Sequence, residues 1–355
     1  MYLSITFDYE LFFGNNNGSY DDVLFEPTYN LIDALEKKNV SATFFADVCS
    51  VPMSKKYEQT SYVDGFTKQI QYMAQHGQDV QLHLHPHWFY SKWKDGQWIF
   101  SNKGYRLHEF IDDERIDGII SDGMQYLYET IQPVKPSYNC VAYRAGGFSM
   151  QPHQKIVKAL YEHGIRVDSS VAPQLVTQSE ANFYDYRHRV EAQNWYLSDS
   201  AEWWVDSTEG KALLEIPVAT VDKSPVGFIF RRLFKPQSVK LNLGPKRGSY
   251  IAIHTNPESK IKTYYHYFTG FNAISMDAYA AEFLYSQVQR LRRKVKGENQ
   301  VVAIIGHPKL VNNVYIENLM RFIDMIDNDS NLEFISIYDA YQMKEKENGA
   351  KEKVQ

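Results

Sequence analysis

Short apolar segments rich in β-branched residues recur along the chain, and most are followed by a stretch with helical periodicity. These segments are continuously apolar instead of alternating, which predicts strands covered on both faces, as in a parallel sheet. The predicted strands are residues 2–8, 40–46, 79–85, 139–144, 164–168, 213–219, 301–307 and 333–338. Repeated alternation of strand and helix predicts a parallel α/β architecture, either an open sheet or a barrel.

Start and stop signals place helices between these strands. Glu26-Pro27 opens a predicted helix that continues through Lys38, because proline is tolerated in the first helical turn. Two more helices are predicted to end at His76-Gly77 and His163-Gly164, where glycine permits the usual C-terminal cap. The remaining predicted helices cover residues 112–131, 276–296 and 312–327.

Two long segments, 88–110 and 174–275, interrupt this alternation, and each carries tryptophans. Interruptions of this length usually build function or a subdomain. The charged segment 343–355 predicts a solvated, disordered tail. We therefore expect one domain over residues 1–342 with insertions near 88–110 and 174–275.

Composition limits the class of protein. Hydrophobic residues make up 44% and charged residues 23%, and the net charge of -5 predicts no nucleic-acid surface. The two cysteines form neither a zinc motif nor a disulfide scaffold. Without a signal peptide or an apolar run long enough to cross a membrane, a cytoplasmic enzyme is the simplest interpretation. The oligomeric state cannot be predicted.

Polar residues that are candidates for a functional site follow the ends of the predicted strands, which is where parallel α/β folds bind ligands. Asp8 and Glu10 follow the first strand, and the strand period of two places them on one side, with Tyr9 on the other. Two neighbouring acids repel, which a metal or a cationic group would relieve. The plain alternative is a pair of acids that opens a loop.

Three histidines, His83, His85 and His87, follow the third strand, and Pro86 argues against a helix there. Two histidines with one carboxylate can bind a metal and leave positions open for water and substrate. A chance cluster of surface histidines is the alternative. Arg144 ends another strand and can hold a carboxylate in its ionised form, and His307 ends a later one.

Taken in order, these segments resemble the polysaccharide deacetylases (NodB-homology, carbohydrate esterase family 4) over most of residues 1–340. The family has a distorted (β/α)7 TIM-like barrel and removes acetyl groups from sugars with a bound divalent metal. Thr6-Phe7-Asp8 matches its first motif, so the resemblance makes Asp8 the catalytic base. The family's metal-binding aspartate corresponds to Tyr9, and we assign the ligand role to Glu10.

The later motifs assign further roles by resemblance. His83 and His87 have the spacing of the family's metal ligands, and His85 is an additional ligand, supporting group or substrate contact. Arg144 would orient Asp8, and His307 would be the general acid.

Differences from the family fall beside these motifs. Gly146 and Gly147 stand where the family motif has proline and tyrosine, which predicts a different substrate groove. A backbone N–H near Ala145 is expected to stabilise an oxyanion. Trp88 is the aromatic residue we expect to touch the sugar, with packing as its alternative role. Two motifs are most similar to the WalW-like branch of the family, which is associated with lipopolysaccharide and O-antigen biosynthesis. They are Leu-His-Leu-His-Pro-His-Trp and Arg-Ala-Gly-Gly.

The sequence therefore predicts a metal-dependent deacetylase, with zinc as the expected metal, that acts on an amino sugar of a polysaccharide or a lipopolysaccharide precursor. One alternative is a metal-free hydrolase that acts on a small cyclic amide. Another is a non-catalytic carbohydrate-binding protein in a glycan assembly complex, because tryptophan-bearing insertions suit sugar binding equally well.

Overall fold

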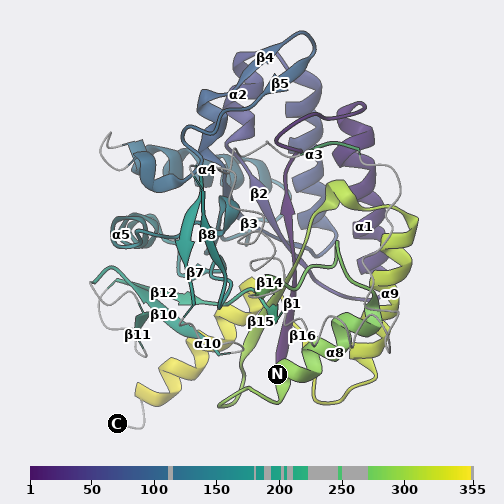
Figure 1. Ribbon diagram of the computed structural model, residues 1–355, viewed down its shortest axis with the longest axis vertical. Coiled ribbons are helices and arrows are strands. Elements are labelled where there is room, and N and C mark those ends of the chain that lie inside the picture. Colours follow the sequence, from purple (N-terminus) through teal and green to yellow (C-terminus); the bar gives the residue numbers. More distant parts are fainter. Residues whose placement is uncertain are drawn as a thin grey trace, which may run out of the picture.

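The protein is built on a ten-stranded mixed sheet surrounded by helices (Figure 1). This computed structural model describes residues 1–110, 115–179, 181–187, 193–200, 204–205, 211–222, 247–249 and 271–352. The sheet order is β11-β10-β12-β7-β6-β3-β2-β1-β15, and β16 also pairs with β1. The parallel strands are β1 (Tyr2–Tyr9), β2 (Thr43–Asp47), β3 (Asp79–Leu84), β6 (Ala142–Ala145), β7 (Val167–Asp168), β12 (Ala212–Glu215), β15 (Val301–Gly306) and β16 (Glu333–Phe334).

The sheet is curled, so its parallel strands approach a closed ring. Beyond β12, Val218 forms a parallel bridge with Ala303 of β15, which connects two strands that stand far apart in the sheet order. The strands β10 (Trp195–Ser198) and β11 (Trp204–Val205) instead run antiparallel on the outer side of β12. The prediction of an α/β fold is confirmed, and the antiparallel pair is an addition that the apolar pattern did not reveal.

Helices cover the outer face of the sheet, in neighbouring positions that largely follow the chain (Figure 1). They are α1 (Glu26–Glu36), α2 (Ser50–Lys56), α3 (Thr60–Gln75), α4 (Arg115–Ile131), α5 (Gln154–Glu162), α8 (Ala281–Arg292) and α9 (Asn313–Asp327). The last helix, α10 (Ile337–Glu352), instead packs through Ile337 and Ala340 in a separate buried cluster with residues of the strands. Gly77 and Gly164 follow α3 and α5 with positive φ angles of 73° and 93°, as the predicted C-caps require. Among the described helices, none has the length and apolar character needed to cross a membrane.

The C-terminal part of the chain differs from its prediction. The predicted strand 333–338 is reduced to β16, and α10 extends through most of the segment that we expected to be a disordered tail. Burial of Ile337 and Ala340 docks the start of this helix, and a Lys344–Glu347 pair supports its later turns. Residues 353–355 lie outside the described residues.

Both predicted insertions contain small two-stranded antiparallel sheets. In the first, β4 (Lys92–Lys94) and β5 (Gln97–Ile99) place Trp98 against Trp88 and Trp93, with ring centroids 4.9 Å and 5.3 Å apart. In the second, β8 (Val176–Gln178) pairs with β9 (Phe183–Asp185), and β13 (Thr220–Asp222) pairs with β14 (Phe271–Ala273). Much of this second insertion, including Trp203, lies outside the described residues.

Two fully buried acids, Asp168 and Glu215, face each other in the register of β7 and β12. Burial raises the pKa of both carboxyl groups, and the charge of Asp168 raises the pKa of Glu215 further. Asp168 accepts a hydrogen bond from the Ser170 hydroxyl at 2.7 Å, and that hydroxyl accepts the Ala145 N–H at 2.8 Å. The acid pair therefore supports the end of β6, next to the groups described below.

Replacing Glu215 with glutamine should make stability less sensitive to rising pH. Because the folded pKa of Glu215 is raised, its contribution to stability is lost as pH rises above the unfolded value of about 4.3. The free energy of unfolding of Glu215→Gln should therefore improve relative to wild type between pH 5 and pH 8, as measured by urea unfolding. Glu333→Gln, at an exposed position of β16, is the control. Parallel curves for Glu215→Gln and wild type would contradict this role of the pair.

Candidate metal and catalytic site

Polar side chains from the carboxyl ends of four strands meet at one edge of the sheet. Asp8 and Glu10 come from the end of β1, His83 from β3, Arg144 from β6 and His307 from the end of β15. The parallel register brings these ends together because His83 pairs with Arg144, while the preceding residues of β1 and β15 pair with each other. The sequence prediction that these five residues share one sheet edge agrees with this arrangement.

The alternation of β1 decides which acids reach this edge. Tyr9 is fully buried on the opposite side. Its hydroxyl donates to Oε1 of Gln69, a residue of α3, at 2.6 Å. Asp8 and Glu10 therefore share the other side, as the strand period predicts.

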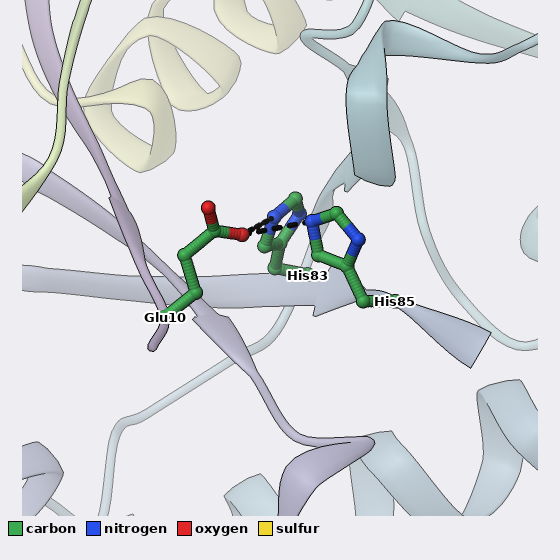
Figure 2. Close-up of side chains that lie close together, drawn as sticks. All are labelled: Glu10, His83 and His85. Carbon is green, nitrogen blue, oxygen red and sulfur yellow. Dashed lines mark hydrogen bonds and ion pairs between the residues drawn. The ribbon is translucent and has the colours of Figure 1, made fainter. Parts of the chain in front are cut away.

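Glu10 lies against two imidazoles in a buried cluster (Figure 2). Its Oε2 is 3.2 Å from Nε2 of His83 and 2.8 Å from Nε2 of His85. Among the described residues, Glu10, His83 and His85 form the group of potential metal ligands whose donor atoms all lie within 4.8 Å of one another. One carboxylate and two imidazoles form a donor set suited to a divalent transition metal.

The orientation of the His83 ring is fixed by a hydrogen bond on the side away from Glu10. Its Nδ1 is 2.8 Å from the carbonyl oxygen of Arg144, so Nδ1 donates there and Nε2 is directed at Glu10. Burial acts to lower the pKa of His83, but the charges of Asp8, Glu10 and Asp47 outweigh it and raise that pKa to about 9. Both nitrogens thus face oxygen acceptors, and the point between Nε2 and Glu10 suits either a proton or a metal cation.

His87, predicted from the family spacing as a ligand, lies outside this cluster, and His85 occupies the corresponding place. The chain turns into a short 3-10 helix at Pro86–Tyr90, which directs His87 among aromatic rings. Its ring centroid lies 4.6 Å from that of Phe13 and 5.4 Å from that of Tyr105. Neither of its nitrogens has a hydrogen-bond partner among the described residues, and burial lowers its pKa well below the usual range.

Arg144 holds Asp8 in one orientation. Its Nη1 donates to Asp8 Oδ1 and to Thr6 Oγ1, both at 2.9 Å. Its Nε and Nη2 donate to the carbonyl and the hydroxyl of Ser169, at 2.8 Å and 2.9 Å. The guanidinium also stacks on Phe45, with 4.4 Å from Cζ to the ring centroid. A guanidinium held by this many hydrogen bonds fixes the direction of the carboxylate that it binds.

His307 faces both acids from the opposite side. Its Nε2 is 3.9 Å from Asp8 Oδ2 and 3.9 Å from Glu10 Oε1. Its Nδ1 and backbone N–H are held by Asp277 at 2.6 Å and 3.0 Å. Burial acts to lower the pKa of His307, but Asp277 outweighs it and raises that pKa. The side chain is 20% exposed, so it is the site group most open to a substrate.

Asp277 and Lys309 were missed by the sequence analysis. Asp277 lies in a stretch predicted to be the first turn of a helix, whereas α8 begins only at Ala281. Lys309 lies two residues after His307, and lysines are almost always exposed. Here it is fully buried, with Nζ 2.7 Å from Glu10 Oε1 and 3.0 Å from the carbonyl of Leu11. Burial would raise the pKa of Glu10, but Lys309 and His85 hold it well below its usual range.

The predicted substrate contact of Trp88 is replaced by a packing role. Trp88 is fully buried, and its Nε1 donates to Asp47 Oδ2 at 2.6 Å. Asp47 Oδ1 in turn accepts the backbone N–H of His85 at 3.2 Å. Burial raises the pKa of Asp47 to about 6, against the opposing effect of His85 and His83. Trp88 therefore acts on the site only indirectly, through the carboxylate that holds the His85 backbone.

Ala145 and Gly146 also contact other parts of the protein and do not line an open groove. The Ala145 N–H donates to Ser170, so it is already occupied and is not the predicted oxyanion donor. A Cβ on Gly146 would lie 2.6 Å from Nδ1 of His85. Glycine at this position therefore leaves room for the His85 ring, not for a substrate.

No family model matches the sequence, and no curated protein matches it. The fold is similar to the putative polysaccharide deacetylase of Mycobacterium smegmatis, with 13% identity, a TM-score of 0.50, and coverage of 98% of this chain and 91% of that one. Puue allantoinase gives 12% identity, a TM-score of 0.48 and coverage of 96% and 89%. The polysaccharide deacetylase of Bacillus cereus gives 9% identity, a TM-score of 0.37, and coverage of 94% of this chain and 90% of that one. At these identities, the likeness to the Mycobacterium smegmatis structure is one of fold.

Proposed function

We propose that the protein is a metal-dependent deacetylase that removes an acetyl group from an amino sugar, built on the barrel of the polysaccharide deacetylases. The observation that carries the proposal is the convergence of Glu10 Oε2 with the Nε2 atoms of His83 and His85. This cluster lies beside Asp8, which is held by Arg144, and beside the partly exposed His307. The fold likeness to the Mycobacterium smegmatis protein supports the same class.

The residues fit a divalent metal. Three donors of suitable chemistry lie within 4.8 Å of one another, and His83 has the backbone partner that metal-binding imidazoles usually have on their second nitrogen. When bound, a divalent cation would supply Lewis acidity to the attacking water and to the acyl oxygen. Zinc remains the predicted metal because carboxylate and imidazole donors suit it.

The chain's own residues supply the proton transfers. Asp8 is oriented by Arg144 through Oδ1, which leaves Oδ2 to accept a proton from the attacking water. His307 is held by Asp277 through Nδ1, so Nε2 carries the proton for the departing amine. The products would be acetate and a free amino sugar.

A metal-free hydrolase that acts on a small cyclic amide is the second candidate. Lys309 favours it, because a buried ammonium already pairs with Glu10. The ammonium contacts Glu10 alone, whereas a divalent metal would also bind the imidazoles of His83 and His85. Metal analysis therefore separates the metal-dependent deacetylase from the metal-free hydrolase. Less than about one metal per chain, with activity retained, would favour the second.

Finer features of the proposal stay predictions. They are the WalW-like branch, a lipopolysaccharide or O-antigen precursor as substrate, and a cytoplasmic location. A panel of N-acetylated sugar nucleotides and lipid-linked sugars, compared with polymeric substrates, would decide among substrate classes.

Metal binding should depend on His85 and not on His87. His85→Gln removes a donor from the cluster, so zinc content should fall from about one per chain toward zero. His87→Gln changes a ring that lies outside the cluster, so zinc content should remain close to wild type. Metal analysis of dialysed proteins measures both. Zinc loss in His87→Gln, with zinc retained in His85→Gln, would return the ligand role to His87.

Loss of either proton-transfer group should abolish turnover while leaving metal content unchanged. Asp8→Asn and His307→Gln should each lower kcat for acetate release by about 10²–10⁴-fold, the usual contribution of a general acid or base. Asp324→Asn, which alters an exposed aspartate paired with Lys38, is the matched control. Acetate release at the wild-type rate from Asp8→Asn would refute the proposed mechanism, and no acetate release from wild type on any substrate would favour a binding role.

A further inference from the structure

Lys309 is an unusual residue because its charge is completely withdrawn from solvent. The side chain is 0% exposed, and its ammonium also lies over the rings of Phe12 and Phe13, 5.2 Å from each centroid. Burying an ammonium is costly unless it is paired. Its pairing partner is Glu10, the carboxylate of the proposed metal cluster.

The two oxygens of Glu10 have different surroundings. Oε1 receives Lys309 at 2.7 Å, whereas Oε2 faces His83 and His85. Lys309 is itself held by the carbonyl of Leu11, so the ammonium position is fixed from two directions. Glu10 is one methylene longer than an aspartate and has more rotamers to restrict. The ammonium therefore selects which carboxylate oxygen is presented to the imidazoles.

We propose that Lys309 is a positioning residue that anchors Oε1 of Glu10, so that Glu10 meets a divalent cation through Oε2 alone, and that its charge weakens the binding of that cation. The inference rests on the proposed metal-dependent function. It concerns Glu10 and the cation only, and gives Lys309 no proton-transfer step.

Packing alone does not account for this lysine. An apolar side chain of similar length could fill the same space against Phe12 and Phe13 without the cost of burying a charge. Lys309 also lies two residues from His307, separated by Pro308, which restricts the backbone between them. One short segment therefore places both the proposed acid and the anchor of Glu10.

The sign of the effect on metal affinity follows from charge. A buried cation next to a ligand repels a divalent cation, and this repulsion is stronger in a buried site than in water. Removing the ammonium also frees Glu10 to move, which acts against binding, but this entropy change is smaller than the electrostatic one. Loss of the lysine charge should therefore tighten metal binding while disturbing the coordination.

The test is a metal titration of purified proteins in competition with a chelator. Lys309→Met should bind zinc at the same stoichiometry as wild type but at least tenfold more tightly. Lys309→Arg retains the charge and should stay within about threefold of wild type. Lys38→Met, which removes a partly exposed lysine paired with Asp324, should equal wild type. If Lys309→Met does not fold, Lys309→Gln replaces it in the same titration.

Cobalt substitution tests the positioning itself. The visible spectrum of bound Co²⁺ responds to coordination number, so it should change in Lys309→Met, where Glu10 can bind through both oxygens, and not in Lys38→Met. Zinc affinity in Lys309→Met that is equal to or weaker than wild type, or an unchanged cobalt spectrum, would overturn the inference. Absence of metal binding by wild type would instead overturn the proposed function, so the two failures are distinguishable.

Discussion

The site depends on one constraint, which is that two carboxylates at the end of β1 are both buried and must both be compensated. Asp8 is compensated by Arg144 and Glu10 by Lys309, each through one oxygen at hydrogen-bonding distance. In each case the second oxygen is left facing an imidazole.

These pairings explain how the fold positions the chemistry. Arg144 reaches Asp8 because β6 and β1 lie in one curled sheet, and its other donors are satisfied by Ser169 after β7. Lys309 reaches Glu10 because β15 is the direct neighbour of β1. The parallel register, set by continuous apolar strands, is therefore what brings charges from distant parts of the chain to one place.

Much of this could be predicted from the sequence, because the signals are local. Strand ends, the alternation around Tyr9 and the histidine cluster are all visible within a few residues. The roles of Lys309 and Asp277 were not visible, since their partners are a carboxylate at the other end of the chain and a histidine on another strand. The choice between His85 and His87 was also not visible, because it depends on where the turn at Pro86 directs each ring.

The close approach of Gly146 to His85 links the loop after β6 to the cluster itself. A side chain at position 146 would have to displace the His85 ring, since its Cβ would lie 2.6 Å from Nδ1. The loop therefore cannot be varied freely to reshape a substrate groove. The first insertion is tied to the same cluster by another route, because its Trp98 packs against Trp88, which binds the Asp47 carboxylate that holds the His85 backbone.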